Sequence, residues 1–285
     1  MKRAITLIAI AAIGAMMLAG CGSGKKITPG STSHFPKINQ EGKVAIVAHR
    51  GFWNCEDAGF MENTIASLKA AQDNGFWGSE FDIHITSDDV VIVNHNNDIQ
   101  GVKIADNPYS VFAKMTHKNG EHPATLDEYL TQGEKCKTTM LIIELKPQKN
   151  EEREDLLWEK TVSALKAHKL FDPNRIAFIS FSHHLCVKVA QEAPQFVNQY
   201  LKGDYAPDVL ASEGINGIDY HKGIFKVSPD YVRRSHEYKM SVNAWTVDKE
   251  SNMRSLAHLG VDAITTNEPL LARQVLGDQE FRLAK

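Results

Sequence analysis

The sequence has little cysteine, no excess of basic residues and no second linker that would divide its body into domains. Four cysteines occur in 285 residues. Three of them, Cys55, Cys136 and Cys186, lie in the body of the chain, so at most one disulfide can form within it and the pairing stays open. Lys and Arg together number 32 against 35 Asp and Glu. A nucleic-acid-binding domain is usually basic, so we expect no nucleic-acid partner.

The first residues have the three-part layout of a secretory signal peptide. A positive start, Met1-Lys2-Arg3, precedes an apolar run from Ala4 to Leu18 and a small-residue end, Ala19-Gly20-Cys21. A membrane-spanning helix needs about 20 apolar residues, so this run is too short to be a good one. Cys21 directly after Leu-Ala-Gly resembles a bacterial lipobox, which implies that it is lipidated and becomes the mature N-terminus. The alternative is ordinary secretion with a chance cysteine.

We expect three segments along the chain. Residues 1–20 are the signal peptide, and residues 21–42 are the lipidated cysteine and a flexible tether rich in Gly, Ser, Thr, Pro and Lys. Residues 43–285 are one domain of a size that suits a single α/β barrel. Gly22 rather than Asp resembles lipoproteins sent to the outer membrane. We therefore expect a secreted protein anchored through Cys21, on the periplasmic or surface side, and leave the leaflet and the oligomeric state open.

Short apolar runs alternate with helical patterns through the body of the chain. The strand candidates are 44–48, 79–85, 140–145, 176–181, 197–201, 217–220, 240–247 and 262–265. Helical patterns cover 64–74, 151–169, 183–192, 229–238 and 249–259. Such alternation predicts parallel strands joined by right-handed crossovers. Eight strands close a barrel, so we predict the α/β class and a (β/α)8 TIM barrel, with a doubly wound open sheet as the alternative.

One segment, residues 90–93, breaks this alternation. Only four residues separate it from the strand that ends at Ile85, whereas a parallel crossover needs a dozen or more. It must therefore form an antiparallel hairpin with that strand. If the turn centres on Ser87-Asp88, position 95 pairs opposite position 80. This register would bring His95 close to Glu80.

Acidic residues stand at the ends of two predicted strands, where barrels carry their active sites. Residues i and i+2 share one face of a strand, so Glu80 and Asp82 point the same way, as do Glu144 and Lys146. Three carboxylates in a barrel mouth repel one another, and a divalent cation with oxygen ligands relieves this. The alternative is a salt-bridge network in which Lys146 and Arg50 neutralise the carboxylates.

Two histidines, His49 and His95, also stand at strand ends beside these carboxylates. Cleavage of a phosphodiester needs a base for the nucleophile and an acid for the leaving oxygen, and histidine titrates in a suitable range. Arg50 and Lys146 would hold the phosphate and offset its developing charge. The residues do not tell which histidine is the acid and which is the base.

Taken in order along the chain, these motifs resemble the glycerophosphodiester phosphodiesterase family, in its bacterial lipoprotein form. The matching motifs are His49-Arg50-Gly51, Glu62-Asn63-Thr64, Glu80-x-Asp82, Thr86-x-Asp88, His95, Glu144-x-Lys146, Ser180-Phe181, residues 243–247 and residues 260–267. The match runs from about Val44 to Pro269. It implies a phosphatidylinositol phospholipase C-like barrel with a small insertion after its second strand.

The resemblance implies a phosphoric diester hydrolase that releases glycerol 3-phosphate and an alcohol from small glycerophosphodiesters. By it, His49 and His95 are the acid–base pair. Its metal would be Ca2+ or Mg2+ on Glu80, Asp82 and Glu144. Arg50 and Lys146 would contact the phosphate, and Glu62 would support the site from the next loop. Trp245 would lie near the glycerol or the leaving group, with core packing as the alternative, and we expect Asn63 to cap the helix that starts at Thr64.

The chain departs from the family pattern after the second histidine. Asn96 replaces the usual Asp, the usual Arg-Thr-Thr run is missing, and the insertion lies at 99–124. These changes leave the choice of head group open. Two alternatives remain: a related barrel phospholipase C or sphingomyelinase D-like enzyme acting on lipids, and a non-catalytic lipoprotein that binds head groups. Damaged catalytic positions would favour the second, and none is seen.

Overall fold

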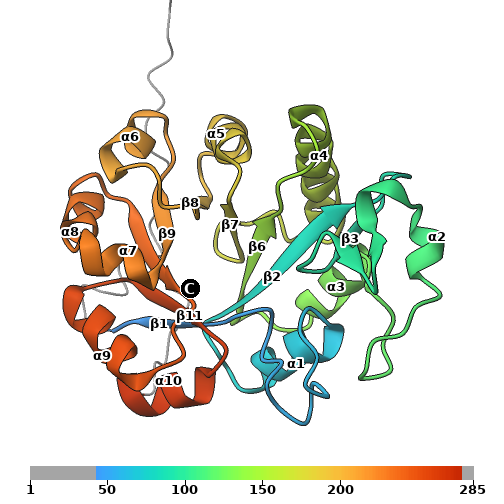
Figure 1. Cartoon of the computed structure of the whole chain (residues 1–285), viewed down its shortest axis with the longest axis horizontal. Coiled ribbons are helices and arrows are strands. Elements are labelled where there is room, and N and C mark those ends of the chain that lie inside the picture. The colour runs from blue at the N-terminus through green and yellow to red at the C-terminus, as the bar shows by residue number, and fades with distance from the viewer. Residues whose placement is uncertain (1–42, 278–285) are drawn as a thin grey trace, which may run out of the picture.

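The computed structural model describes residues 43–277 (Figure 1). The predicted signal peptide, the lipidation site Cys21 and the tether lie outside these residues. The strands are β1 (Ala45–Ala48), β2 (Gly78–Ile85), β3 (Val91–Val93), β4 (Asp98–Ile99), β5 (Val102–Lys103), β6 (Met140–Leu145), β7 (Ile176–Ser180), β8 (Val197–Tyr200), β9 (Gly217–His221), β10 (Ser241–Trp245) and β11 (Ala263–Thr266). Within the described part, no helix has the length and apolar character needed to cross a membrane.

The helices follow the strands around the outside of the molecule (Figure 1). They are α1 (Ile65–Asp73), η2 (Ile104–Asp106), α2 (Tyr109–Phe112), α3 (Leu126–Gly133), α4 (Glu151–Ala167), α5 (His183–Glu192), α6 (Pro207–Ser212), α7 (Lys222–Val227), α8 (Asp230–Glu237), α9 (Glu250–Leu259) and α10 (Pro269–Leu276). The predicted helical patterns coincide with α1, α4, α5, α8 and α9 to within one or two residues at each end.

Eight parallel strands close into a barrel. The strand order is β1, β11, β10, β9, β8, β7, β6, β2, and β2 pairs back onto β1. The closing pairs are Val47 with Gly78 and Ala45 with Ala263. The predicted (β/α)8 barrel is confirmed, and closure of the sheet excludes the open doubly wound alternative.

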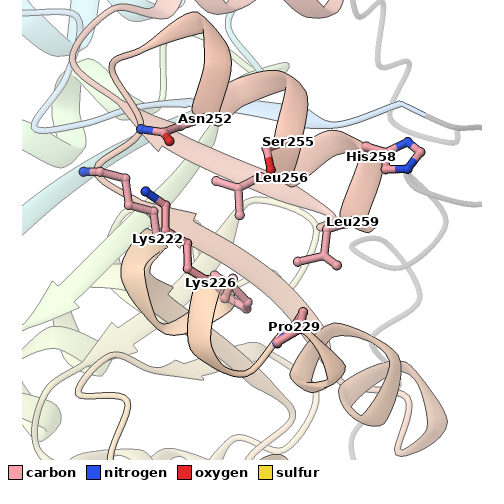
Figure 2. Close-up of a pocket in the computed structure, with 9 residues that line it drawn as sticks. Lys222, Lys226, Pro229, Asn252, Ser255, Leu256, His258 and Leu259 are labelled. Atoms are coloured by element: carbon pink, nitrogen blue, oxygen red, sulfur yellow. The ribbon is translucent and has the colours of Figure 1, made fainter.

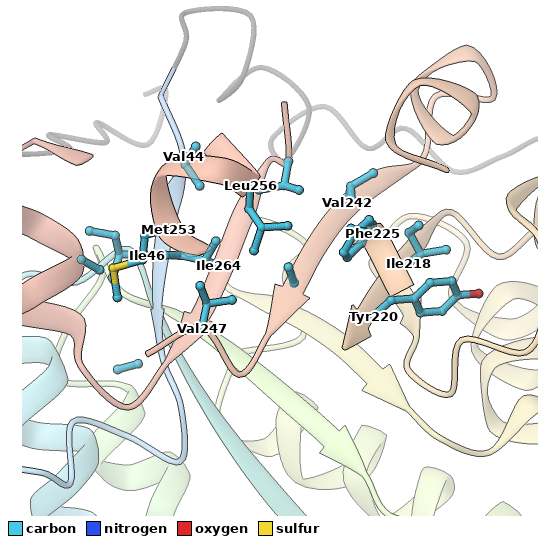
Figure 3. Close-up of a cluster of buried hydrophobic side chains, with 14 of the residues drawn as sticks. Val44, Ile46, Ile218, Tyr220, Phe225, Val242, Val247, Met253, Leu256 and Ile264 are labelled. Carbon is cyan, nitrogen blue, oxygen red and sulfur yellow. The ribbon is translucent and has the colours of Figure 1, made fainter. Parts of the chain in front are cut away.

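Side chains alternate between the barrel interior and the helix layer because successive strand residues point to opposite faces. On β2, Phe81 and Ile83 pack outward with apolar residues of α3 and α4. On the other side of the barrel, Ile46, Val242 and Ile264 pack against Met253 and Leu256 of α9 (Figure 3). A second group of buried apolar residues, among them Val47, Ile142 and Ala177, fills the interior of the barrel, and the polar residues of the strand ends lie at its carboxyl-terminal mouth.

The hairpin formed by β2 and β3 confirms the antiparallel excursion, but the predicted register is wrong by one residue. Ile83 pairs with Val93, which places position 95 opposite position 81 rather than 80. The turn holds three residues instead of two, because the Thr86 amide donates to the Val90 carbonyl across it at 3.0 Å. Asp89 makes this turn possible by adopting the left-handed conformation, with φ of 65°.

The insertion after β3 carries the β4–β5 hairpin, η2 and α2, and its Ile99, Ile104 and Phe112 form a small apolar core with Ile92 of β3. It is attached to the barrel at the start of α1. Both carboxylate oxygens of Glu121 accept hydrogen bonds there, from the amides of Ile65 and Ala66 at 3.0 Å each. A carboxylate at a helix N-terminus satisfies free amides and interacts favourably with the helix dipole. With the hydrogen bonds from Asn119 to the Ala58 carbonyl at 3.3 Å and from the Ser87 amide to the Asn107 carbonyl at 3.1 Å, this contact holds the insertion in place.

Candidate active site

The predicted carboxylates converge at the carboxyl-terminal mouth of the barrel. Glu80 and Asp82 point inward from β2, and Glu144 points inward from the neighbouring strand β6, where it pairs in register with Asp82. All three are buried, and one oxygen of each lies within 4.8 Å of the others. This is the arrangement predicted from their spacing in the sequence.

The charges of this cluster are only partly neutralised by protein groups. Oε2 of Glu80 accepts a hydrogen bond from the Arg50 amide at 2.8 Å, but its Oε1 is buried without a hydrogen-bond partner. Burial, together with Asp82 and Glu144, raises the pKa of Glu80 well above its usual range. Burial and Asp82 likewise raise the pKa of Glu144 to about 8. The three carboxylates therefore cannot all ionise easily without an additional cation.

Two basic side chains border the cluster. Nζ of Lys146 lies 2.8 Å from Oε1 of Glu144 and 3.2 Å from Oδ1 of Asp82. Nη1 of Arg50 lies 2.9 Å from both carboxylate oxygens of Glu62, and its Nε lies 3.8 Å from Oδ2 of Asp82. The predicted salt-bridge network is thus present in part. Because Glu62 also engages Arg50, two basic side chains face four carboxylates and cannot neutralise all of them in ionised form.

A tight turn after β1 brings Arg50 to this position. Arg50 and Gly51 both have positive φ, 56° and 77°, which turns the Arg50 amide toward Glu80. At Gly51 a Cβ would lie 2.4 Å from Oγ of Ser67, so only glycine fits between the turn and α1. The His-Arg-Gly motif therefore has a structural reason as well as a chemical one.

The side-chain amide of Asn267 holds His49 in place, and Asp248 in turn orients that amide. Nδ1 of His49 lies 2.8 Å from Oδ1 of Asn267. Asp248 accepts hydrogen bonds from both the side-chain nitrogen and the main-chain amide of Asn267, at 3.0 and 2.8 Å. Trp53 donates to the same Asn267 oxygen at 3.1 Å. Since an amide oxygen only accepts, Nδ1 of His49 must carry the proton, and its Nε2 is free to accept one.

His95 has a comparable but looser support. Its Nδ1 lies 3.0 Å from Oδ1 of the exposed Asn96, and its carbonyl oxygen lies 3.3 Å from Nε2 of His84. Burial lowers the pKa of His95, although Asp82 opposes this. His95 thus stays beside the carboxylates despite the shifted register of the hairpin. Asn96 supplies the Nδ1 contact here.

The expectation that Asn63 caps α1 is wrong. Thr64 is the cap, and its Oγ1 accepts from the Ser67 amide at 3.2 Å. Asn63 instead contacts Asp82 twice: its Nδ2 donates to Oδ2 at 2.8 Å, and its Oδ1 accepts from the Asp82 amide at 3.1 Å. These bonds, with Lys146 and His95, outweigh burial and lower the pKa of Asp82. No local sequence signal separates such a contact from a cap.

Trp245 lies across the mouth from the carboxylates, as the last residue of β10. Its Nε1 donates to the Asp219 carbonyl at 2.9 Å, and its half-buried ring packs edge-to-face on Phe181 at 5.6 Å and on His221 at 5.3 Å. No contact joins it to the other predicted site residues among those the structure describes. Trp245 therefore forms an aromatic surface opposite the carboxylates. It is not fully buried in the core, and it does not contact the carboxylates.

Two cavities flank this part of the molecule. One, of about 360 Å3, begins beside His84 and runs between the insertion and the loop after β6. The other, of about 390 Å3, is a groove on the outer surface between α7 and α9, lined by Lys222, Lys226 and Leu256 among others (Figure 2). Neither lining contains a predicted site residue, although the first cavity includes Pro147, the neighbour of Lys146 in the chain.

Comparison with known proteins agrees with this geometry. A sequence model of the glycerophosphoryl diester phosphodiesterase family matches residues 49–271. A glycerophosphodiester phosphodiesterase of Caldanaerobacter subterraneus is 25% identical over 239 residues, which cover 80% of this chain and 95% of that protein.

Solved structures are similar over the same region. A glycerophosphodiester phosphodiesterase of Parabacteroides distasonis is 36% identical, has a TM-score of 0.79, and the match covers 82% of this chain and 97% of that one. An Oleispira antarctica phosphodiesterase, solved with the product sn-glycerol-3-phosphate, is 22% identical with a TM-score of 0.69, and the match covers 83% of this chain and 98% of that one. The chain is therefore a phosphoric diester hydrolase, and it belongs to the glycerophosphoryl diester phosphodiesterase family.

Proposed function

We propose that the barrel mouth hydrolyses glycerophosphodiesters to glycerol 3-phosphate and an alcohol, with a divalent cation and with His49 and His95 as the acid–base pair. The observation that carries this proposal is the buried group of Glu80, Asp82 and Glu144 with two histidines, His49 and His95, that both interact with the charge of Asp82. A product of the same kind, sn-glycerol-3-phosphate, is bound by the similar Oleispira antarctica phosphodiesterase.

The carboxylate cluster fits a hard cation. Glu80, Asp82 and Glu144 offer oxygen ligands of the kind that Ca2+ and Mg2+ prefer. The buried Oε1 of Glu80 lacks a hydrogen-bond partner, which is costly unless a cation takes it up. When bound, the cation would offset the negative charge of the phosphate. Asn63 would keep Asp82 oriented for this task.

The histidines divide the proton transfers. Nε2 of His49 accepts the proton of the nucleophile, which is water or a neighbouring hydroxyl of the substrate; in the second case a cyclic phosphate forms, and water then opens it to glycerol 3-phosphate. As the phosphorus–oxygen ester bond breaks, His95 in its protonated form donates a proton to the departing oxygen. Arg50 and Lys146 contact the phosphate and stabilise its developing charge. The assignment of His49 as base rests on burial, which lowers the pKa of His49 to about 4 and so keeps the imidazole neutral, with its proton on Nδ1 beside Asn267.

Substitution of each histidine tests this division. We expect His49→Ala and His95→Ala to lose nearly all hydrolysis of glycerophosphodiesters while the far-ultraviolet circular dichroism and melting temperature stay close to wild type. Release of glycerol 3-phosphate, measured enzymatically, gives the activity. Substantial residual turnover in either variant would refute its role. Assays with intact phospholipid beside the deacylated diester separate this function from a phospholipase C or sphingomyelinase D-like activity.

We also propose that the protein is exported and held at a membrane through a lipid on Cys21. The support is the sequence of residues 1–22, with its basic start, short apolar run and lipobox-like end. Several acyl chains on one residue anchor a protein stably, unlike a single chain. The substrate would then be met outside the cytoplasm.

A further inference from the structure

His84 is a buried histidine beside the active site that the proposed mechanism does not use. It lies on β2 two residues after Asp82, and the alternation of strand residues places both side chains on the inward face. Only 3% of its surface is exposed. On its other side it borders Asn97 and Asp98 of the loop after β3. A polar ring buried at this place needs a hydrogen-bond partner.

The partner of His84 is the main chain of His95. Nε2 of His84 lies 3.3 Å from the carbonyl oxygen of His95. A carbonyl oxygen only accepts hydrogen bonds, so Nε2 of His84 carries a proton and donates it. The bond joins a barrel strand to a loop residue eleven positions further along the chain. It therefore ties the main chain of the proposed acid to a rigid element.

The remaining hydrogen bonds of this loop are made within the loop itself. Nδ1 of His95 lies 3.0 Å from Oδ1 of its exposed neighbour Asn96. The side-chain nitrogen of Asn94 donates to the carbonyls of Asn96 and Asp98, at 2.8 and 3.2 Å. These bonds set the curvature of the loop, but they move with it. The bond from His84 differs because it starts from a buried side chain of the barrel.

We propose that His84 is a positioning residue for His95, and that its bond to the His95 carbonyl holds the loop so that the imidazole of His95 reaches the departing oxygen. The inference rests on the proposed function, in which His95 protonates that oxygen. A general acid acts only from hydrogen-bond distance of the atom that it protonates. A displacement of the loop by about 1 Å therefore costs rate. His84 itself donates to the loop and takes no part in bond cleavage.

The leaving group separates the positioning of an acid from damage to the rest of the site. An alkyl alcohol leaves as a strongly basic alkoxide, which needs a proton as the phosphorus–oxygen bond breaks. p-Nitrophenol leaves as a stable phenolate and needs no acid. The loss expected for His95→Ala therefore applies to alkyl diesters, and hydrolysis of glycerophospho-p-nitrophenol should be largely spared. Damage to the carboxylate cluster would instead slow the hydrolysis of both kinds of diester.

The test compares glycerophosphomethanol with glycerophospho-p-nitrophenol. The enzyme is supplied with its cation, and kcat/KM is obtained from the initial release of methanol or p-nitrophenol. We expect His84→Ala to lose about 10- to 100-fold with the methyl diester and less than about threefold with the nitrophenyl diester. His84→Leu fills the space of the ring without an N–H group, and it should give the same result even if His84→Ala does not fold.

Two further variants tie the effect to the hydrogen bond and to His95. His84→Gln keeps an N–H donor and should recover most of the lost rate. The double variant His84→Ala/His95→Ala should hydrolyse the methyl diester no more slowly than His95→Ala alone, because both changes act through one group. His168→Ala is the matched control. It removes a half-buried histidine that contacts Glu134 and Asp127 at the end of α4, and both diesters should be hydrolysed at the wild-type rate.

The outcomes distinguish this inference from the proposed function. Suppose that His95→Ala shows the leaving-group effect, but His84→Ala and His84→Leu slow both diesters equally or neither of them. The positioning role would then be overturned, and the proposed function would stand. A His84→Gln variant no faster than His84→Ala would also overturn it. If His95→Ala itself slows both diesters equally, or neither, the assignment of His95 as the acid is wrong, and the positioning role fails with it.

Discussion

At the scale of single residues, the support of His49 is the most specific feature of the site. Asp248 orients Asn267, and Asn267 keeps the imidazole proton on Nδ1. Among the described residues, no contact joins Asn267 to Arg50 or Lys146, which are predicted to bind the phosphate. None joins it to the carboxylate cluster of Glu80, Asp82 and Glu144 either. It is therefore a positioning residue, and its effect on hydrolysis should pass through His49.

Removal of this support should reduce kcat. We expect Asn267→Ala and Asp248→Asn to lower kcat by about 10- to 100-fold with a smaller change in KM, because a misplaced catalytic group loses rate rather than substrate binding. Steady-state kinetics measure both constants. Gln195→Ala, at an exposed position just before β8 and so at the amino-terminal end of the strands, is the control and should behave as wild type. A kcat for Asn267→Ala within twofold of wild type would rule out the positioning role.

The carboxylates themselves predict how cation binding depends on pH. Burial and neighbouring carboxylates raise the pKa of Glu80, and the pKa of Glu144 rises to about 8. A raised pKa means that these groups hold protons at neutral pH, and the cation must displace them. The apparent affinity should therefore rise with pH up to about 8 and fall as pH decreases.

Calorimetric titration with Ca2+ or Mg2+ at pH 6 and pH 8 measures this. One displaced proton gives about a tenfold change in affinity per pH unit, so we expect binding at pH 8 to be at least tenfold tighter. Proton release should appear as a dependence of the heat on the buffer's ionisation enthalpy. An affinity that is equal at the two pH values would contradict the raised pKa of these carboxyls.

At the scale of elements, Glu121 joins the insertion to the start of α1. Glu121 accepts from the first two amides of α1, whose other cap is Thr64. Glu121→Ala removes both bonds, and loss of a capping interaction costs about 0.5–2 kcal/mol. We expect a loss of about 1 kcal/mol in the free energy of unfolding, measured by urea denaturation.

Glu159→Ala provides the comparison for this change. Glu159 is exposed on α4, and surface substitutions of this kind usually stay within about 0.5 kcal/mol of wild type. If Glu121→Ala were no more destabilising than Glu159→Ala, the attachment of the insertion to α1 would not contribute to stability.

The elements also show what periodicity can and cannot predict. The hairpin was predictable because four residues cannot make a parallel crossover, yet its register depended on Asp89 adopting positive φ. That conformation is a property of the folded turn and has no clear signal in the sequence. Inward-pointing residues of β2 and β6 were predictable from alternation alone. Asn63 was misassigned because a residue before a helix can cap it or turn away from it.

At the scale of the whole molecule, the barrel could be predicted from the alternation of eight strands with helices, and its closure follows from pairing of β1 with β2 and β11. The site could be predicted as far as its charged residues, because polar groups at strand ends converge in a closed barrel. Contacts between segments that are far apart in the sequence could not be predicted. Asn267 lies 218 residues from His49, and only the closed barrel brings them together.

Export and anchoring involve the whole chain as well. In bacteria that process lipoproteins, the full-length protein should take up labelled palmitate and fractionate with membranes. Cys21→Ser should lose the label and leave the membrane fraction, because the lipidated sulfur is gone. A protein that stays in the membrane fraction after Cys21→Ser, or a wild type that never incorporates palmitate, would contradict the anchor.

Turnover of one glycerophosphodiester with and without a divalent cation tests the central claim most directly. The purified enzyme is treated with a chelator and then supplied with Ca2+ or Mg2+, while glycerol 3-phosphate is measured. We predict no release after chelation, restored release with one of the two cations, and no restoration in Asp82→Asn, which lacks a carboxylate of the cluster. Full activity in the presence of chelator, or a phosphorylated product other than glycerol 3-phosphate, would contradict metal-dependent glycerophosphodiester hydrolysis at this site.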